Sequence, residues 1–209
     1  MSQTAASPSL PTIAFIGGGN MASAIIGGLI HQGHPASQIE VVEPWAEARE
    51  ALRKNYGIEA QAEAGPALQR AQIVVWAVKP QTFRDAAAQA KAHTQGALHL
   101  SVAAGIRSDS IAQWLGTERI VRTMPNTPAL VGKGMSALYA RPAVSAPERQ
   151  SIEAIMATTG EFLWVDSEPQ LDAVTALSGS GPAYVFYFLE AMTRAGTGMG
   201  LTEQQAHQL

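Results

Sequence analysis

Three consecutive glycines, Gly17 to Gly19, separate a short apolar run from a longer one. The run at residues 12–16 is short and largely β-branched or aromatic, as in a buried strand. The run at residues 21–30 carries its large apolar side chains at helical spacing, so the hydrophobic period changes across the glycines. A strand, a glycine turn and a helix in this order indicate that something binds close to the backbone, where a side chain would be in the way.

The alternation of strand and helix patterns continues as far as residue 166. Helices are predicted at residues 45–55, 81–92, 108–116 and 146–159, the third with a serine or aspartate cap and a glycine end. Further strands are predicted at residues 39–44, 71–80, 98–104, 119–128, 134–140 and 161–166. This order predicts an α/β fold with a mostly parallel sheet covered on both faces.

No strand pattern follows Asp166, and the rest of the chain is predicted to be helical apart from glycine breaks. We therefore expect a dinucleotide-binding domain at residues 12–166 and the start of a helical domain at residues 167–209, with the boundary near residues 164–168. Residues 1–11 lack a basic start and an apolar core, so they are predicted to be a flexible tail rather than a signal peptide.

The composition excludes several classes of function. The chain has no cysteine, which rules out disulfides, a thiolate nucleophile and cysteine zinc sites, and a cytoplasmic location is the expectation. With a net charge of -3 and scattered basic residues, neither nucleic acid nor an anionic membrane is an expected partner. His31 and His34 are separated by a glycine and followed by a proline, which break the helix that would align them, so no metal site is predicted.

Gly17, Gly19 and Ala22 fit the pattern G-x-G-x-x-A between a strand and a helix. In such a site the first glycine permits a tight turn, the second lets the backbone approach a pyrophosphate, and the small third residue lets helix and strand pack closely. The phosphates would lie at the N-terminus of the helix that begins near Asn20. The alternative is a plain glycine turn.

Glu43 lies at the end of the second predicted strand, where a carboxylate often binds a ribose hydroxyl of NAD. Its distance from the glycines is longer than usual, and a solvated loop glutamate is an equal alternative. Arg49 or Arg53 could still reach the additional phosphate of NADP. The sequence therefore leaves the choice between the two dinucleotides open.

Several further segments together resemble the pyrroline-5-carboxylate reductase family. They are IGGGNMASAIIGGL (16–29), WAVKPQ (76–81), SVAAGI (101–106), RTMPNTPALVGKG (122–134) and TALSGSGPAYVFYFLEAM (175–192). The resemblance implies a Rossmann domain, a helical dimerisation domain, and reduction of L-1-pyrroline-5-carboxylate to L-proline by NADPH or NADH, with NADPH preferred. It also implies homodimers, which in the family often assemble into larger rings.

The resemblance assigns roles to particular residues. Those expected at the cofactor are Ile16, Gly17, Gly18, Gly19, Asn20, Met21, Ala22, Glu43, Ala77, Val78, Lys79, Pro80, Val102, Ala103 and Ala104. Those expected at the substrate are Asn126, Thr127, Ser178, Gly179 and Ser180.

Each assignment has a structural alternative. Lys79 could be a solvated lysine at a strand end, and Val102 to Ala104 could be ordinary sheet packing. Asn126 and Thr127 could form a plain turn. Ser178 to Gly181 before Pro182 are predicted to form a helix N-terminus whose amides could hold a carboxylate, although capping by Ser180 explains the same pattern.

The helix after Pro182 is apolar on all sides, so it is predicted to be buried in a subunit interface or a domain core, and the resemblance favours the interface. The sequence departs from the family pattern in two places. No asparagine occurs at residues 62–69, where the family often has one at the cofactor, and the family continues beyond Leu209 with the hydroxyl nearest the imine. We therefore expect a truncated chain with no assigned catalytic residue.

Two rival functions remain from the sequence. One is a related Rossmann reductase that acts on a hydroxy acid or another imine, although such hydroxy-acid enzymes normally carry a lysine where this long helix has Tyr184 and Phe186. The other is a non-catalytic dinucleotide-binding module.

Overall fold

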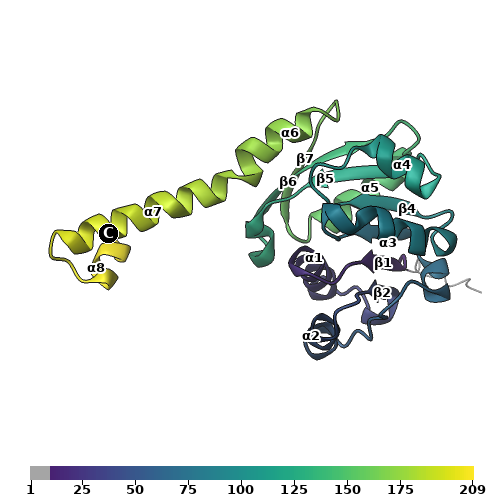
Figure 1. Cartoon of the computed structure of the whole chain (residues 1–209), viewed down its shortest axis with the longest axis horizontal. Coiled ribbons are helices and arrows are strands. Elements are labelled where there is room, and N and C mark those ends of the chain that lie inside the picture. The colour runs from purple at the N-terminus through teal and green to yellow at the C-terminus, as the bar shows by residue number, and fades with distance from the viewer. Residues whose placement is uncertain (1–9) are drawn as a thin grey trace, which may run out of the picture.

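A computed structural model describes residues 10–209 of the chain, and most of the predicted tail lies outside this range. The described part is an α/β unit from which a helical arm projects (Figure 1). The sheet has seven strands: β1 (Ile13–Ile16), β2 (Ile39–Val42), β3 (Ile73–Trp76), β4 (Leu98–Ser101), β5 (Ile120–Met124), β6 (Gly134–Ala140) and β7 (Gly160–Trp164). The predicted strands are confirmed, although β2, β3, β4 and β5 are shorter than expected.

The strand order is β2-β1-β3-β4-β5-β6-β7. All neighbouring pairs are parallel except β5 and β6, which run antiparallel. The mostly parallel sheet of a Rossmann-type fold is therefore confirmed. The chain leaves β1 toward β2 and returns on the other side of β1 with β3, so the order reverses there, and such a switch point opens a crevice at the carboxyl ends of the strands.

Helices cover both faces of the sheet. They are α1 (Asn20–His31), α2 (Ala46–Tyr56), α3 (Phe83–Ala90), α4 (Ser108–Leu115) and α5 (Ala146–Met156). Apolar residues of α1, α2 and α5 pack with Ile13 and Phe15 on one face. Residues of α3 and α4 pack with Ala14 and Ile16 on the other. Successive residues of β1 point to opposite faces, which is why a parallel strand covered on both sides is apolar throughout.

Two helix ends show how the sequence sets the boundaries. Gly57 and Gly116 adopt left-handed conformations directly after α2 and α4, so the glycine end predicted for the helix at residues 108–116 is confirmed. The prediction that a serine or aspartate caps α4 is wrong. The residue before α4 is Arg107, and the amide of Ser108 instead donates a hydrogen bond to the carboxylate of Glu168, which is distant in sequence.

The last part of the chain leaves the sheet as a helical arm. It consists of α6 (Gln170–Val174), a π-helical turn (Thr175–Gly179), α7 (Gly181–Gly198) and α8 (Glu203–Gln208). In Figure 1, α7 extends away from the sheet and α8 folds back against its far end. Among residues 10–209, no helix has both the length and the hydropathy needed to cross a membrane.

A buried histidine in β4 gives the sheet a predictable pH dependence. His99 is 2% exposed, and its Nδ1 accepts a hydrogen bond from Nε1 of Trp76 at 3.0 Å. Burial, together with the positive charge of Arg119, lowers the pKa of His99 to about 4 from its ordinary value of 6.5. The ring is therefore neutral at neutral pH.

We expect the free energy of unfolding to fall as the pH is lowered from about 6.5 toward about 4, because only the unfolded chain takes up a proton on His99 in this range. The loss at pH 5 should be about 2 kcal/mol. Urea unfolding at pH 7 and pH 5 measures it. The variant His99→Gln keeps an acceptor for Trp76 and should lose most of this dependence; an unchanged dependence would contradict the assignment.

Candidate functional site

A cleft opens at the switch point of the sheet, where the carboxyl ends of β1, β2 and β3 meet. Its volume is about 760 Å³, and its floor includes Ile16, Val42 and Ala77. This is the position at which open α/β sheets bind their ligands. The cleft is large enough for a substantial part of a dinucleotide.

Gly17 makes the turn from β1 into the cleft. Its φ is +97°, a conformation that residues with a side chain rarely adopt, and its amide donates to the carbonyl of Val42 at 2.8 Å. A Cβ on Gly17 would lie 2.5 Å from the carbonyl oxygen of Ala77. Both the backbone angle and the space therefore require glycine.

Gly19 precedes α1 and differs from Gly17 in what surrounds it. Its φ is -72°, and a Cβ there would meet no atom within 4 Å. The space next to Gly19 is therefore open toward the cleft, and glycine is not needed for the turn. Since the first amides of a helix lack intrahelical partners, this end of α1 can bind an anion that approaches closely.

Glu43 is 7% exposed, and its carboxylate holds the glycine loop. Its Oε2 accepts from the amide of Gly18 at 2.7 Å, and its Oε1 accepts from the amide of Trp45 at 2.9 Å. Arg49 donates from Nη1 to the carbonyls of Glu43 and Pro44. Glu43 thus lines the cleft with its carboxylate hydrogen-bonded to backbone amides, and it is not the solvated loop glutamate of the alternative. Its role at the ribose remains a prediction.

The structure brings together part of the predicted cofactor set. Ile16, Gly17, Gly19, Glu43, Ala77, Val78 and Lys79 line the cleft. Gly18, Asn20, Met21 and Ala22 belong to the glycine loop and the first turn of α1, and Pro80 follows Lys79 at the start of a short 3-10 turn. Val102, Ala103 and Ala104 follow β4 outside the cleft, and Ala103 is buried in the core.

Other residues that line the cleft were not predicted. Trp45, Glu47 and Ala48 come from the start of α2, whereas Thr82, Asp85, Ala86 and Gln89 come from α3 and the turn before it. The sequence offered one usable signal, because residues directly after the second strand of such a unit face the cleft. Lys79 is the one basic residue in this lining, with Glu43, Glu47 and Asp85 as acidic ones.

The predicted substrate residues lie along the junction with the helical arm. The side chain of Asn126 donates from Nδ2 to the carbonyl of Ser178 at 3.2 Å and accepts at Oδ1 from the amide of Met135 at 2.9 Å. A Cβ on Gly179 would lie 2.8 Å from the Cε of Met124. Asn126 therefore connects the loop after β5 to the π-helical turn, and exposed Thr127 lies beside it.

A helix does begin where predicted, because α7 starts at Gly181 with Pro182 in its first turn, but a helical segment precedes it directly. The chain is already helical from Gln170, and the amide of Ser180 donates to the carbonyl of Thr175 at 2.9 Å. The hydroxyl of Ser180 bonds the same carbonyl and does not cap α7. The glycines and serines mark a π-helical turn inside a longer helix, a feature common at functional sites.

The sequence matches known protein families over both the sheet and the helical arm. Residues 12–105 match the family described as NADP oxidoreductase coenzyme F420-dependent, and residues 168–209 match the family described as pyrroline-5-carboxylate reductase dimerisation. A pyrroline-5-carboxylate reductase of Pseudomonas aeruginosa is 46% identical over 203 residues, which cover 96% of this chain and 74% of the relative. The chain belongs to the pyrroline-5-carboxylate reductase family.

Solved structures of this reductase family have the same fold. The pyrroline-5-carboxylate reductase of Coxiella burnetii superposes with a TM-score of 0.88 at 36% identity, covering 95% of this chain and 74% of that one. The pyrroline carboxylate reductase of Plasmodium falciparum, solved with NADP bound, superposes with a TM-score of 0.83 at 26% identity over 95% of this chain and 73% of that one. The reductase family therefore accounts for both the sheet and the helical arm.

Proposed function

We propose that this chain reduces 1-pyrroline-5-carboxylate to proline with a reduced nicotinamide dinucleotide, NADPH or NADH. The observation that carries the proposal is the open N-terminus of α1 at Gly19, in the cleft where three parallel strands end. Membership of the reductase family supports the substrate, and the relative from Plasmodium falciparum with NADP bound supports the cofactor.

The residues present fit a dinucleotide. The missing Cβ at Gly19 leaves room for a pyrophosphate against the first amides of α1, where the helix dipole favours negative charge. Glu43 keeps the amide of Gly18 turned inward and so fixes the shape of the loop. Exposed Lys79, which follows β3, supplies a positive charge in the lining of the cleft.

When bound, the dinucleotide supplies the hydride that reduces the carbon–nitrogen double bond. The chain itself has to align two flat rings and hold the substrate carboxylate, a task of orientation rather than of acid–base chemistry. The segment Val102 to Ala104 would lie on the nicotinamide side. Asn126, Thr127 and the turn at Ser178 to Ser180 would face the imine.

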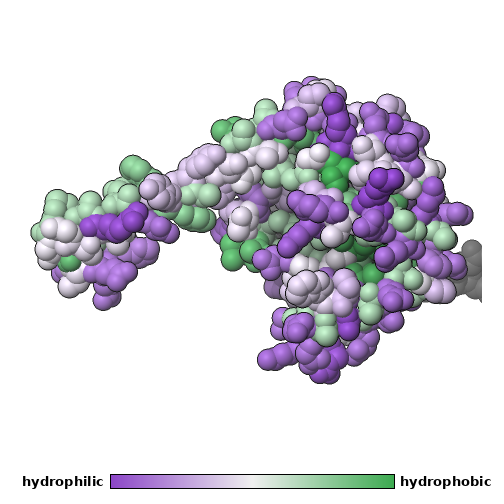
Figure 2. All heavy atoms as spheres, viewed as in Figure 1, coloured by the Kyte–Doolittle hydropathy of each residue, from purple (hydrophilic) through white to green (hydrophobic). Residues whose placement is uncertain are grey.

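The apolar arm is proposed to form a homodimer. The exposed residues of α7 include Tyr184, Val185, Phe186, Tyr187, Phe188, Leu189 and Met192. Green residues lie along this arm in Figure 2. Contiguous apolar surface of this kind marks a protein interface. Assembly of dimers into rings and a cytoplasmic location remain predictions.

The direct test follows the absorbance of NADPH or NADH while pyrroline-5-carboxylate is added. We expect oxidation that depends on the imine and the formation of proline. A hydroxy-acid enzyme would instead reduce the oxidised dinucleotide when given a hydroxy acid, and a binding module would bind the dinucleotide without turnover. Either of these results in place of imine-dependent oxidation would contradict the proposal.

A further inference from the structure

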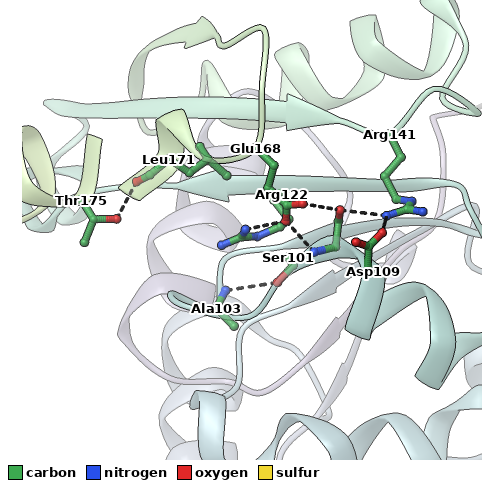
Figure 3. A network of polar contacts seen from close by, with 9 residues as sticks. Ser101, Ala103, Asp109, Arg122, Arg141, Glu168, Leu171 and Thr175 are labelled. Atoms are coloured by element: carbon green, nitrogen blue, oxygen red, sulfur yellow. Dashed lines mark hydrogen bonds and ion pairs between the residues drawn. The ribbon is translucent and has the colours of Figure 1, made fainter. Parts of the chain in front are cut away.

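Glu168 lies between β7 and α6, where the chain leaves the sheet for the helical arm. Its side chain is 11% exposed and binds two groups from distant parts of the sequence. The carboxylate accepts from the amide of Ser108 at 2.5 Å, from the hydroxyl of Ser108 at 2.8 Å and from Nη1 of Arg122 at 2.6 Å. Figure 3 shows Glu168 pointing from the arm side toward Arg122 in the sheet.

Both partners need this carboxylate. Ser108 is the first residue of α4, so its amide has no partner within the helix, and a negative charge at this end is favoured by the helix dipole. Arg122 lies in the middle of β5 with its side chain 8% exposed. Among residues 10–209, Glu168 is the carboxylate that pairs with it, and a buried guanidinium without such a partner would be strongly unfavourable.

The carboxylate is charged at neutral pH. Burial by itself raises the pKa of Glu168, but the hydrogen bonds from Ser108 and Arg122 outweigh this effect and leave the pKa below its ordinary value.

The contacts of Glu168 reach toward both halves of the proposed site. On the sheet side, residues 102–107 connect Ser101 to Ser108, and the hydroxyl of Ser101 accepts from the amide of Ala103 at 3.3 Å. This loop therefore begins beside Arg122, which pairs with Ser101 in register, and ends at Ser108. Both of its ends are fixed near the carboxylate of Glu168.

On the arm side, Leu171 follows Glu168 closely and is 1% exposed. The hydroxyl of Thr175 donates to the carbonyl of Leu171 at 2.7 Å, at the start of the π-helical turn that contains Ser178 to Ser180. Because residues 168–171 are held against the sheet, they determine the position of this turn. Glu168 therefore connects the π-helical turn to the loop at residues 102–107, since its backbone belongs to the start of the arm and its side chain binds Ser108 at the end of the loop.

We propose that Glu168 is a positioning residue for the reaction, which couples the placement of the imine-side turn at residues 175–180 to that of the nicotinamide-side loop at residues 102–107. This inference rests on the proposed function for its kinetic consequence. Glu168 touches neither reactant and acts through Ser108 and Arg122. Its loss should disturb the alignment of the two rings while the glycine loop, at the other half of the sheet, keeps its shape.

The variant Glu168→Gln tests the coupling, with Glu118→Gln as the matched control. Glu118 is 60% exposed and pairs with Arg141, whose Nη1 also contacts the hydroxyl of Ser108. The control thus removes an ion pair close to the same helix but outside the junction. In Glu168→Gln, the rate of amide hydrogen exchange should rise both at residues 102–110 and at residues 168–181. In Glu118→Gln, the rates in these two segments should stay unchanged. Faster exchange in only one segment, or equal effects in both variants, would overturn the proposal.

Kinetics provide the second readout. In Glu168→Gln we expect kcat/KM for the imine to fall roughly tenfold or more, since small misplacements of reacting groups are costly. The dissociation constant for NAD(P)H should stay within about twofold of the unaltered chain. A parallel loss of dinucleotide binding would indicate general destabilisation and would refute the positioning role.

A milder variant covers the case in which Glu168→Gln does not fold. Ser108→Ala keeps both charges and the amide at position 108, but it removes the two hydrogen bonds of the hydroxyl, to Glu168 and from Arg141. We expect kcat/KM to fall by roughly threefold with binding of NAD(P)H unchanged. An unchanged kcat/KM in folded Ser108→Ala would count against the proposal. If the unaltered chain shows no imine-dependent oxidation, the proposed function fails, whereas the exchange measurement still decides whether Glu168 couples the two segments.

Discussion

Replacing Gly19 with alanine should leave the fold intact and weaken NAD(P)H binding by roughly tenfold to a hundredfold. The new Cβ meets no protein atom within 4 Å, and the φ of -72° suits alanine, so the melting temperature should not fall. The methyl group would instead occupy the space through which a pyrophosphate reaches the amides of α1. Each charged hydrogen bond lost there costs about 1.5–3 kcal/mol.

Fluorescence titration measures the binding of NAD(P)H, and thermal unfolding measures stability. Two further variants serve as comparisons. Gly198→Ala, in α7, also adds a Cβ in open space but lies on the projecting arm, so both properties should stay unchanged. Gly17→Ala should lose stability as well as binding, because its φ is positive and its Cβ would meet Ala77. Normal binding by Gly19→Ala would show that no phosphate approaches α1.

A negative charge on the arm should break the proposed dimer. Phe188 is 64% exposed in the single chain and lies among the aromatic residues of α7. In Phe188→Asp an apolar anchor is lost and a carboxylate must be desolvated, so dimerisation should weaken by about 2 to 4 kcal/mol, a factor of roughly thirty to a thousand. Sedimentation equilibrium over a range of concentrations measures the change.

The control for this experiment is Leu163→Asp, which places the same charge at a residue of β7 that is 44% exposed. It should leave the association constant unchanged. A dimer of normal strength in Phe188→Asp, or equal weakening in both variants, would show that α7 is not the interface.

The sheet could be predicted because its signals are local. Four apolar residues in β1 and in β3, followed by a glycine or a proline turn, identify buried parallel strands without knowledge of their partners. The turn at Gly17 was predictable for the same reason, since its chemistry depends on the backbone of a few neighbouring residues.

Features that depend on distant residues were missed. The cap of α4 comes from Glu168, which no local pattern around Ser108 could reveal. The start of α7 at Gly181 was predicted, but the π-helical turn that joins it directly to the helical segment from Gln170, and that supplies the acceptor for the amide of Ser180, was not. The cleft wall formed by Asp85 and Gln89 depends on how α3 lies against the sheet, which sequence spacing does not determine.

The order of the strands has a consequence for how the chain is made. From β3 onward each new strand joins the same edge of the sheet, in the order in which the ribosome releases it. The glycine turn can thus be completed once β3 has emerged, long before α7 is synthesised. Nascent chains should acquire a protease-resistant nucleotide cleft first, and pairing between subunits through α7 should follow.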